Sequence, residues 1–464
     1  MPDSALPSRT VSPPTPSPSL GSHYRWVICG LLFFSTTVNY MDRNVITFLK
    51  EFFCTPVAQG GFGWSNSDYS YVTGLFTLFY AGMTVLAGWV IDKIGTKMGL
   101  ALSLIVWSIF GIANALVGRL VAMHVLVRSA FGIGEGGNFP ASIKTVAEWF
   151  PKRERALATG IFNSGSSVGI MVAALFVPWC LVHFGDNRGW KMAFILTGLA
   201  GFLWLIFWFW LYDTPARQKR LSSTEYDYIH VDDEIVAVEN EAADKAKVSW
   251  WKLLSYRQTW SFFFGKFMTD GIWWFYMFWL PDYLKKQFGM TNQQVMLPTF
   301  VVFGVAIVGS IYGGSIPMGM IKKGMPVYKA RMIAMLLIAI CPLVVLTTQY
   351  FGDINHFGKM AAALAVAVIC IGASAHQAWS ANLFTTVSDM FPKKAVGSVI
   401  GIGAMAGGLG GFVVQLLAGA LTDLYKATPQ VAYFLMFIVC ALSYLMAWGI
   451  MKALVPRHKP ITDL

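Results

Sequence analysis

The second and third apolar segments of the chain are joined by the stretch Gly88-Trp-Val-Ile-Asp92-Lys-Ile-Gly95-Thr-Lys97. A related stretch follows the eighth apolar segment, where the sequence reads Gly313-Gly-Ser-Ile-Pro-Met318-Gly-Met-Ile-Lys322-Lys323-Gly324. Weak internal symmetry of this kind is typical of membrane proteins built from two similar sets of helices. The repeated stretch therefore predicts two helical halves.

The composition places these helices in a lipid bilayer. Charged residues make up 13% of the 464 residues and hydrophobic residues 56%, whereas soluble domains contain about 25% charged residues. Apolar segments recur at the spacing needed for spans of ~20 residues. We expect an all-α integral membrane protein with twelve transmembrane helices, near residues 24–50, 68–91, 98–118, 122–149, 156–183, 190–212, 259–287, 293–320, 328–349, 358–390, 396–424 and 430–454.

The charged segment 213–258 divides the spans into two sets of six, so we expect six-helix bundles at 24–212 and 259–454. Within this central loop, residues 225–247 suggest a surface helix. The Pro- and Ser-rich residues 1–23 contain no apolar core of signal-peptide length, and we interpret them as a disordered tail. A second short tail covers residues 455–464.

The basic residues predict which side each loop faces. With the N-terminus inside, 23 of the 35 Lys and Arg fall on the inner side, 8 on the outer side and 4 within spans. The positive-inside rule then places both termini in the cytoplasm. The net charge of +11 reports this topology, and we expect no nucleic-acid partner. Six cysteines scattered singly predict no metal site.

The first span contains the polar stretch Asn39-Tyr40-Met41-Asp42-Arg43-Asn44, with apolar sequence on both sides. A charged side chain inside a span costs roughly 2.5–3.5 kcal/mol on insertion scales, so it marks a functional site by default. Arg suits recognition of a carboxylate, because its planar fork delivers two parallel hydrogen bonds. The alternative is an ion pair that only holds helices together.

The fourth span carries two further charges, Arg128 and Glu135, seven residues apart and therefore on one helical face. We expect Arg128 to hold Glu135 ionised, and Asp42 to point toward both, since it lies about 100° from Arg43 around its helix. The fifth span adds the polar side chains of Asn163 and Ser166. Proton and substrate sites would then be neighbours on two helices.

The stretch from Gly88 to Lys97 resembles the signature loop of the major facilitator superfamily. The resemblance implies that Gly88, Asp92, Gly95 and Lys97 form a gating latch, in which the glycines allow close helix approach and Asp92 accepts hydrogen bonds. Met318 stands at the acidic position of the second half, so we expect a weak latch there. This superfamily fold consists of two six-helix halves that rock around a central site.

The charged stretches of the first, fourth and fifth spans resemble the anion:cation symporter family within that superfamily. The tenth span, Gly372 to Lys394, makes the sequence most similar to bacterial hexuronate carriers, which transport glucuronate or galacturonate. The resemblance implies proton-driven uptake through the bacterial inner membrane, with Arg43 binding the carboxylate and Asp42, Glu135 and Arg128 serving proton coupling. It further implies substrate contacts from Asn39, Tyr40, Tyr80, Asn163 and Ser166. Ser166, where some galactonate-type relatives carry a longer amide, leaves the substrate open.

The second half offers candidates with two interpretations each. His376 is either a proton carrier or a satisfied structural donor, while Gln377 and Asn382 are candidate ligands of sugar hydroxyls. Lys266 and Asp270 can form an ion pair four residues apart, and aromatic residues beside them either contact a sugar or pack the bundle, with Trp274 and Tyr276 as the candidates. In the sixth span we expect Trp204, Trp208 and Trp210 to face lipid or the membrane interface and not a ligand.

We therefore predict a monomeric proton symporter of a hexuronate, with no cofactor, the lipid bilayer as its environment and a small carboxylated sugar as its partner. A symporter of another organic anion such as an aldonate, or one coupled to sodium, remains the nearest alternative. A membrane enzyme would need a catalytic constellation near an interface, and a nontransporting sensor would need a sizeable soluble domain. The sequence shows neither feature.

Overall fold

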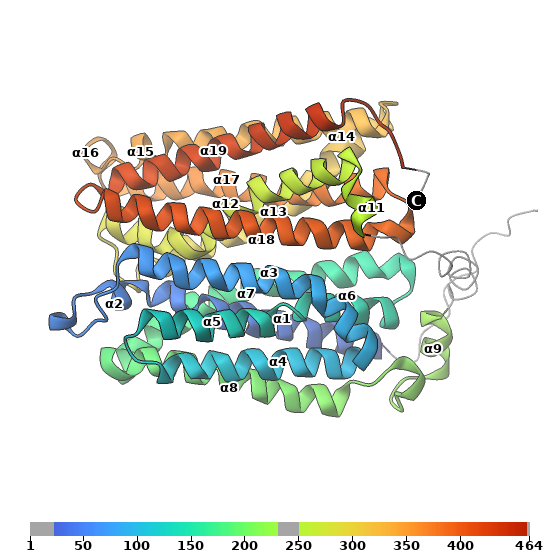
Figure 1. Cartoon of the computed structure of the whole chain (residues 1–464), viewed down its shortest axis with the longest axis horizontal. Coiled ribbons are helices and arrows are strands. Elements are labelled where there is room, and N and C mark those ends of the chain that lie inside the picture. Colours follow the sequence, from blue (N-terminus) through green and yellow to red (C-terminus); the bar gives the residue numbers. More distant parts are fainter. Residues whose placement is uncertain (1–22, 231–249, 462–464) are drawn as a thin grey trace, which may run out of the picture.

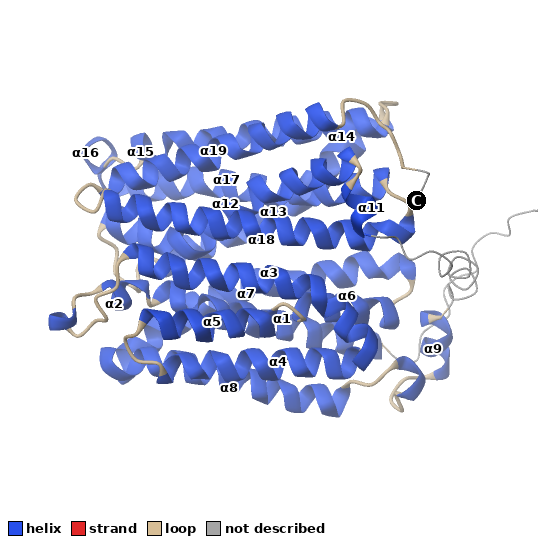
Figure 2. Ribbon diagram, in the orientation of Figure 1, coloured by secondary structure: helices blue, strands red, loops and turns tan. Residues whose placement is uncertain are grey.

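The computed structural model describes residues 23–230 and 250–461. Every regular element in these two ranges is helical, and long helices run side by side through the molecule (Figures 1 and 2). Helices α9 (Ser223–Ile229) and α11 (Trp250–Leu254) lie at the same end as the C-terminus, which we name the terminal end. The opposite end, with α2 (Lys50–Cys54) and α16 (Ile354–Phe357), is named the far end.

The first half contains the helices expected from the first six apolar segments. Their bounds are α1 (Tyr24–Phe48), α3 (Asn66–Ile94), α4 (Thr96–Ala113), α5 (Val121–Glu135), α6 (Asn138–Trp149), α7 (Lys152–Phe184) and α8 (Asp186–Leu211). The second half forms the neighbouring layer in Figure 1. It contains α12 (Arg257–Phe288), α13 (Met296–Lys322), α14 (Val327–Ile340), α15 (Thr348–Phe351), α17 (Ala361–Met390), α18 (Lys393–Leu424) and α19 (Pro429–Leu454).

Proline explains interruptions in two of the expected helices. The fourth span is divided between α5 and α6 at Gly136 and Gly137, because Pro140 has no N–H to donate to the carbonyl of Gly136. The ninth span changes to a 3₁₀ helix over Cys341–Thr347, where Pro342 occupies the first turn. Of the expected surface helix at 225–247, α9 covers the beginning, and residues 231–249 lie outside the described ranges.

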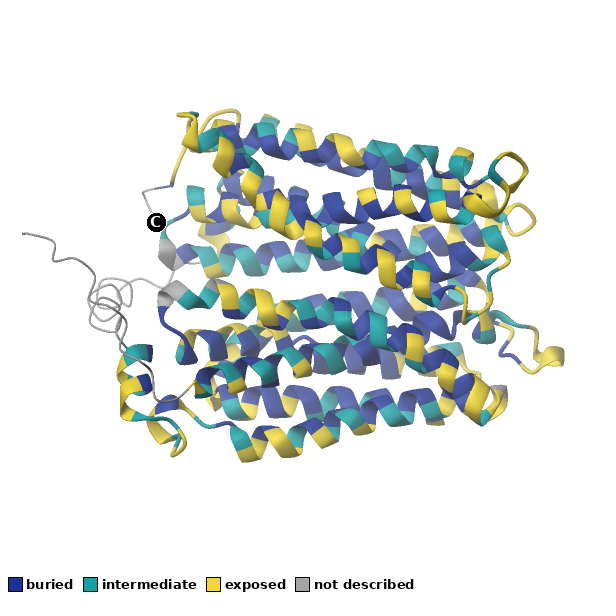
Figure 3. Cartoon of the chain, turned by 180° about the vertical axis from the view of Figure 1, so that it is seen from behind, coloured by how far each residue is buried: buried dark blue, intermediate teal, exposed yellow. Residues whose placement is uncertain are grey.

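Three long helical segments contain charged side chains near their middle. Nine segments in the described part of the chain are long and apolar enough to cross a membrane. The other three are α1, the α5–α6 pair and α12, and their central charged side chains are largely buried among neighbouring helices. Figure 3 shows buried residues where helices face each other and exposed residues on the outer surfaces. The charges are thus kept away from lipid by the bundle itself.

Helices α3 and α18 form a seam between the two halves. At the far end, Asp423 of α18 accepts hydrogen bonds from the backbone N–H groups of Asn66 (2.9 Å) and Ser67 (2.7 Å) at the start of α3. Small residues continue the contact toward the middle, where Gly419 meets Ser70, Gly411 meets Thr77 and Gly408 meets Ala81. The glycines of α18 thus allow the close helix packing expected from the sequence.

The seam ends near the middle of the bundle. Beyond Gly408, the next glycines of α18 face their own half, Gly403 against Phe262 and Gly401 against Trp250. On α3, a side chain added at Gly82 or Gly88 would meet nothing within 4 Å. The halves are therefore in contact at the far end, and these α3 and α18 positions do not meet toward the terminal end.

Gly408→Val should weaken this seam. A Cβ at Gly408 would lie 2.0 Å from the Cβ of Ala81, and overpacking of this kind costs about 1–3 kcal/mol. We expect a lower midpoint of thermal unfolding in detergent, measured by intrinsic fluorescence. Gly314→Val is the matched control, because an added Cβ at that exposed helical position meets nothing within 4 Å. Equal midpoints for the two variants would contradict a close seam.

Candidate functional site

The polar stretch of the first span lies inside α1 and is buried by other helices. Helix α1 continues for five residues beyond Arg43, so neither Asp42 nor Arg43 belongs to a helix end. Arg43 is 1% exposed and Asp42 2% exposed. Asn39, one turn before Arg43, is also buried. An interior of this kind retains polar side chains only where other groups compensate them.

Arg43 forms an ion pair with Glu135 of α5. Its Nε lies 2.8 Å from Oε2 of Glu135, and its Nη2 donates a 3.2 Å hydrogen bond to Oδ1 of Asn39. We expected Glu135 to be held by Arg128, its neighbour two turns away on α5, and the structure differs. The partner of Glu135 is the arginine of the neighbouring helix, because the Arg128 side chain extends to the backbone of α1.

Aromatic rings from both halves surround the Arg43 guanidinium. Its carbon lies 4.3 Å from the ring centre of Tyr40 and 4.5 Å from that of Tyr80. Trp274, from α12 of the second half, lies at 5.3 Å. Cation–π contacts of this kind stabilise a guanidinium that has left water. Arg43 therefore lies where the two halves meet, and Tyr40 and Tyr80 lie beside it.

Arg128 lies behind Arg43 in the first half. Its Nη2 donates a 3.0 Å hydrogen bond to the backbone carbonyl of Arg43, and its guanidinium carbon lies 4.9 Å from the ring centre of Phe76. Phe76 is also 5.6 Å from the Arg43 guanidinium, so one ring separates two cations. The Nε and Nη1 groups of Arg128 are buried without a partner among the described residues. This arginine consequently supports α1 and retains unused donors.

Asp42 points away from Arg43. Thr197 of α8 and Trp107 of α4 lie beside its carboxylate, yet neither oxygen has a partner at hydrogen-bond geometry in the described part of the chain. Glu135 and Arg128 interact with it electrostatically without a hydrogen bond. The two carboxylates and two guanidinium groups cancel in formal charge. We name these four residues the charge quartet: Asp42, Arg43, Arg128 and Glu135.

The fifth-span candidates lie beside α1 and outside the quartet. Gly165 and Gly169 of α7 pack directly against the backbone of α1 at Thr37 and Tyr40. Ser166 donates its hydroxyl to the carbonyl of Asn163 in its own helix at 2.7 Å. Asn163 is exposed, and its side chain forms no hydrogen bond with a described residue. These two side chains are therefore free of any contact with Arg43.

Two of the tenth-span candidates, His376 and Asn382, form contacts with other helices of the second half. His376 stacks on Trp273, with ring centres 5.1 Å apart, and its Nδ1 lies 2.9 Å from the hydroxyl of Tyr444. Asn382 donates to the carbonyl of Gly313 at 2.6 Å and thereby joins α17 to α13. Gln377 is half-buried on the same helix. These contacts favour the structural interpretation of His376 and Asn382.

Trp274 and Tyr276 lie on different faces of α12. Trp274 contacts the Arg43 guanidinium, as described above. The hydroxyl of Tyr276 lies within 2.8 Å of a Cβ built at Gly372, on the side where α17 packs. Positions two residues apart in a helix point about 200° apart, so the two rings cannot line one site. We therefore remove Tyr276 from the candidate substrate contacts.

The sixth-span tryptophans differ from the expectation in two of three cases. Trp204 and Trp208 are buried, and their indole N–H groups donate to the carbonyls of Leu31 and Lys97, both at 3.0 Å. Trp210 is 66% exposed. The prediction that Trp204 and Trp208 face lipid was wrong, because an indole N–H inside a bundle can be satisfied by a carbonyl of the neighbouring helix.

The expected gating loop lies at the terminal end, and its bonds stay within the first half. Asp92 accepts from Lys144 of α6 at 2.6 Å, and Lys97 pairs with Asp213 at 3.2 Å. Partial burial of Asp213 opposes ionisation, but the N–H of Thr214 and the Lys97 ammonium hold its pKa below the ordinary value. Gly95 closes α3 with a φ of +80°, a conformation that favours glycine.

The second half has a different arrangement at the corresponding place. Met318, at the acidic position, is exposed. The acid is instead supplied by Asp389 at the end of α17, whose carboxylate binds Arg331 of α14 at 2.5 and 3.2 Å. The absent acid at Met318 is therefore replaced by a different ion pair inside the same half.

A second buried ion pair, which was not predicted from the sequence, joins the halves at the far end. Lys50 of α2, 2% exposed, lies 2.5 Å from Oδ2 of Asp282 in α12 and 4.1 Å from the ring centre of Trp279. Asp282 also binds Lys286 at 3.1 Å and the hydroxyl of Tyr433. The sequence contained an indication of this pair. Lys50 and Asp282 lie at the ends of the first and seventh spans, which are equivalent spans of the two halves.

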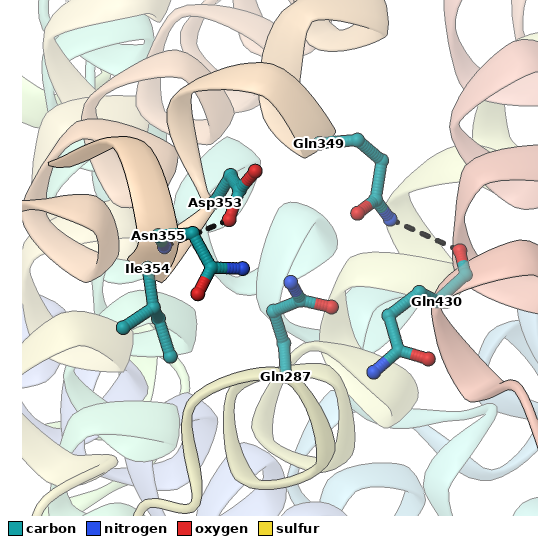
Figure 4. A pocket seen from close by; sticks show the side chains of 6 residues that line it. All are labelled: Gln287, Gln349, Asp353, Ile354, Asn355 and Gln430. Atoms are coloured by element: carbon teal, nitrogen blue, oxygen red, sulfur yellow. Dashed lines mark hydrogen bonds between the residues drawn. The ribbon is translucent and has the colours of Figure 1, made fainter. Parts of the chain in front are cut away.

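A polar surface pocket of about 360 Å³ opens elsewhere at the far end (Figure 4). It is lined by Gln287, Gln349, Asp353, Ile354, Asn355 and Gln430. The lining comes from the second half alone, and its ring of amides contains no Lys or Arg. This pocket is therefore separate from the charge quartet.

The fold and the site define the class of protein. Two helical halves, with charged side chains buried at their junction, form a multi-pass membrane transporter and not an enzyme. Across residues 32–415 the sequence matches the Major Facilitator Superfamily. The chain belongs to this superfamily.

Relatives and solved structures agree with this assignment. The chain is 30% identical over 431 residues to the hexuronate transporter of Escherichia coli (strain K12), which covers 92% of this chain and 94% of that protein. It is 32% identical over 294 residues to the galacturonate transporter of Dickeya chrysanthemi, covering 63% and 81%. The fold is similar to a bacterial homolog of the human lysosomal transporter Spinster in an inward-facing, occupied conformation, with a TM-score of 0.70, 17% identity and coverage of 96% and 100%.

Asp282→Asn should open the far end. The substitution leaves Lys50 and Lys286 without their counter-charge, and an uncompensated buried charge costs about 3–5 kcal/mol. We expect faster labelling of Thr73→Cys, a buried seam position, by a membrane-impermeant maleimide in a cysteine-free background. Lys285→Met is the matched control, because the partner Glu51 is 59% exposed and surface pairs contribute little. Unchanged labelling in the Asp282→Asn protein would contradict a far-end gate.

Proposed function

We propose that the chain is a proton symporter that imports a hexuronate through the bacterial inner membrane by alternating access. The observation that carries the proposal is the Arg43 guanidinium, buried at the junction of the halves with Glu135 along one edge. Its environment, with rings from both halves, suits a carboxylated sugar, since aromatic faces pack against the apolar face of a sugar ring. The similarity to hexuronate and galacturonate transporters supports the same substrate class.

The substrate carboxylate and the Glu135 carboxylate would compete for the same cation, Arg43. In the structure Glu135 neutralises Arg43. A proton added to Glu135 removes that negative charge and releases the guanidinium, whose planar fork then binds the sugar carboxylate in two parallel hydrogen bonds. A bound carboxylate and a protonated Glu135 leave the quartet with its original formal charge. This exchange couples uptake of the anion to uptake of a proton.

Asp42 offers a second position for a proton. Both of its oxygens lack hydrogen-bond partners among the described residues, so protonation there breaks no existing bond. Asp42 stands next to Arg43 in sequence while facing α4 and α8. A change in its charge therefore acts on the quartet electrostatically and leaves the Arg43–Glu135 contact geometrically intact. We assign Asp42 to proton coupling and not to sugar contact.

The asymmetry between the two ends supports an inward-facing state. With the terminal end in the cytoplasm, the Lys50–Asp282 pair and the α3–α18 seam close the outer side. On the inner side, Asp92 bonds Lys144 of its own half and no described side chain of the other half. Alternating access then requires breaking the far-end contacts and forming new ones at the terminal end.

The deciding experiment is uptake of labelled glucuronate and galacturonate by purified protein in liposomes. An inward proton gradient should drive accumulation of one or both acids, and an uncoupler should abolish it. A sodium gradient of the same size should have no effect. Accumulation driven by sodium would contradict the proposal that protons are the coupling ion. Accumulation of an aldonate, with neither uronate accumulating, would contradict the proposed substrate.

Arg43→Lys should weaken substrate binding. Lysine keeps the charge but cannot bind Glu135 or a carboxylate through a planar fork. We expect the half-saturating concentration for uptake to rise at least about tenfold, the equivalent of roughly 1.4 kcal/mol. Arg257→Lys, the same change at an exposed position at the start of α12, is a control that should leave it unchanged. An unchanged value in the Arg43→Lys protein would remove Arg43 from the substrate site.

Glu135→Gln should separate exchange from accumulation. Glutamine has nearly the shape of a protonated glutamate and cannot carry a proton through the cycle. We expect counterflow exchange of internal and external sugar acid to persist, whereas accumulation driven by the proton gradient falls to the passive level. Asp42→Asn should behave in the same way. Accumulation at the parent level in both variants would exclude these carboxylates as proton carriers.

A further inference from the structure

One charged pair at the junction lies outside the charge quartet. Lys266 and Asp270 of α12 form an ion pair, with Nζ 2.6 Å from Oδ2. The side chains keep 8% and 19% exposure, so the pair is not sealed inside the second half. The ordinary interpretation of such a pair is structural, since residues four apart on a helix meet easily. Its position relative to Arg43 indicates a further role.

The pair continues the helical row that contains Trp274. Residues 266, 270 and 274 follow one another at four-residue spacing and lie along one side of α12. Trp274 is the second-half residue that contacts the Arg43 guanidinium, at 5.3 Å. Asp270 is therefore one helical turn from that contact, toward the terminal end, and one turn rises about 5.4 Å. Lys266 is one turn further.

The surroundings fix the carboxylate in place. A Cβ added to Gly407 of α18 would lie 2.3 Å from Oδ2 of Asp270. The carboxylate fits only because this position is glycine. On the other side, Lys266 lies 4.5 Å from the ring centre of Phe384 in α17. Both charged groups are consequently held between α17 and α18 at a defined place along α12.

We propose that Asp270 selects for sugar acids with a single carboxylate. The proposal rests on the proposed function, in which one carboxylate binds Arg43. A six-carbon acid is slightly longer than one helical turn, so its remote end reaches the level of Asp270. A hydroxyl, ring oxygen or aldehyde there can bond the Lys266–Asp270 pair. A second carboxylate meets the negative charge of Asp270, and like charges at short range in a partly desolvated site repel strongly.

Asp270→Asn tests the proposal directly. The substitution keeps the side-chain shape beside Gly407, removes the negative charge and leaves Lys266 free to bind a second carboxylate. Competition against a labelled sugar acid is measured with galacturonate and with galactarate, which carries a carboxylate at each end. We expect the preference for galacturonate to fall at least tenfold. An unchanged preference in protein that still transports would overturn the proposal.

The double variant Lys266→Met with Asp270→Asn is the matched control. It removes both charges, so neither repulsion nor attraction of a second carboxylate remains. Its affinity for galactarate should stay below that of Asp270→Asn by tenfold or more. Equal affinities in the two variants would show that Lys266 does not face the remote end of the substrate, and the proposal would fall.

A competition experiment on the unaltered protein tests the proposal without relying on the folding of a variant. Galactarate and its monoamide have nearly the same shape, but the monoamide carries a single carboxylate. We expect the monoamide to compete at a concentration at least tenfold lower than galactarate. Equal competition would overturn the role of Asp270. Failure to accumulate either uronate would instead overturn the proposed substrate, and the comparison can then be repeated with whichever labelled sugar acid the protein accumulates.

Discussion

The ion pair between Arg43 and Glu135 is the interaction on which the central arrangement depends. A guanidinium keeps its proton even when it is buried. Its positive charge must therefore be stabilised by the groups around it. Glu135 neutralises it, while Tyr40, Tyr80 and Trp274 contact its faces. Because Trp274 belongs to the second half, the compensation of one residue in α1 already requires both halves. The same cation is thereby a contact between the two bundles and, in the proposed function, the group that binds the substrate carboxylate.

The break between α5 and α6 helps to position Glu135 beside Arg43. Gly136 and Gly137 follow Glu135 directly, and Pro140 ends the possibility of a continuous helix. A Cβ at Gly136 would lie 2.9 Å from Met83, and one at Gly137 would lie 2.6 Å from the hydroxyl oxygen of Ser103. The two glycines thus let α5 end close to α3 and α4. Glu135 is positioned by this close approach at the level where α1 presents Arg43.

The positions of the helices and the four residues of the quartet could be predicted from the sequence. The hydrogen-bond and ion-pair partners of those four residues could not. Apolar length and punctuation locate the spans because lipid leaves a backbone few alternatives. Spacing on one helix placed Arg128 and Glu135 on a common face, yet the long Arg128 side chain bonds α1 instead. Lys50 and Asp282 are 232 residues apart, and spacing within a helix carries no information about such pairs. Trp204 and Trp208 show the same limit, since only the packed neighbours reveal whether an indole is buried.

Charge balance connects these observations to coupling. Around the junction, Asp42 and Glu135 offset Arg43 and Arg128, and Asp270 offsets Lys266. At the far end, Lys50 faces Asp282. The described charges at the junction therefore balance, and under the proposed function a carboxylate that binds Arg43 displaces the carboxylate of Glu135. Displacement alone would leave an unpaired negative charge in a medium of low dielectric, which is costly. Under the proposed function, a proton on the displaced carboxylate removes that cost, which is why a site of balanced charge favours binding of the anion together with a proton.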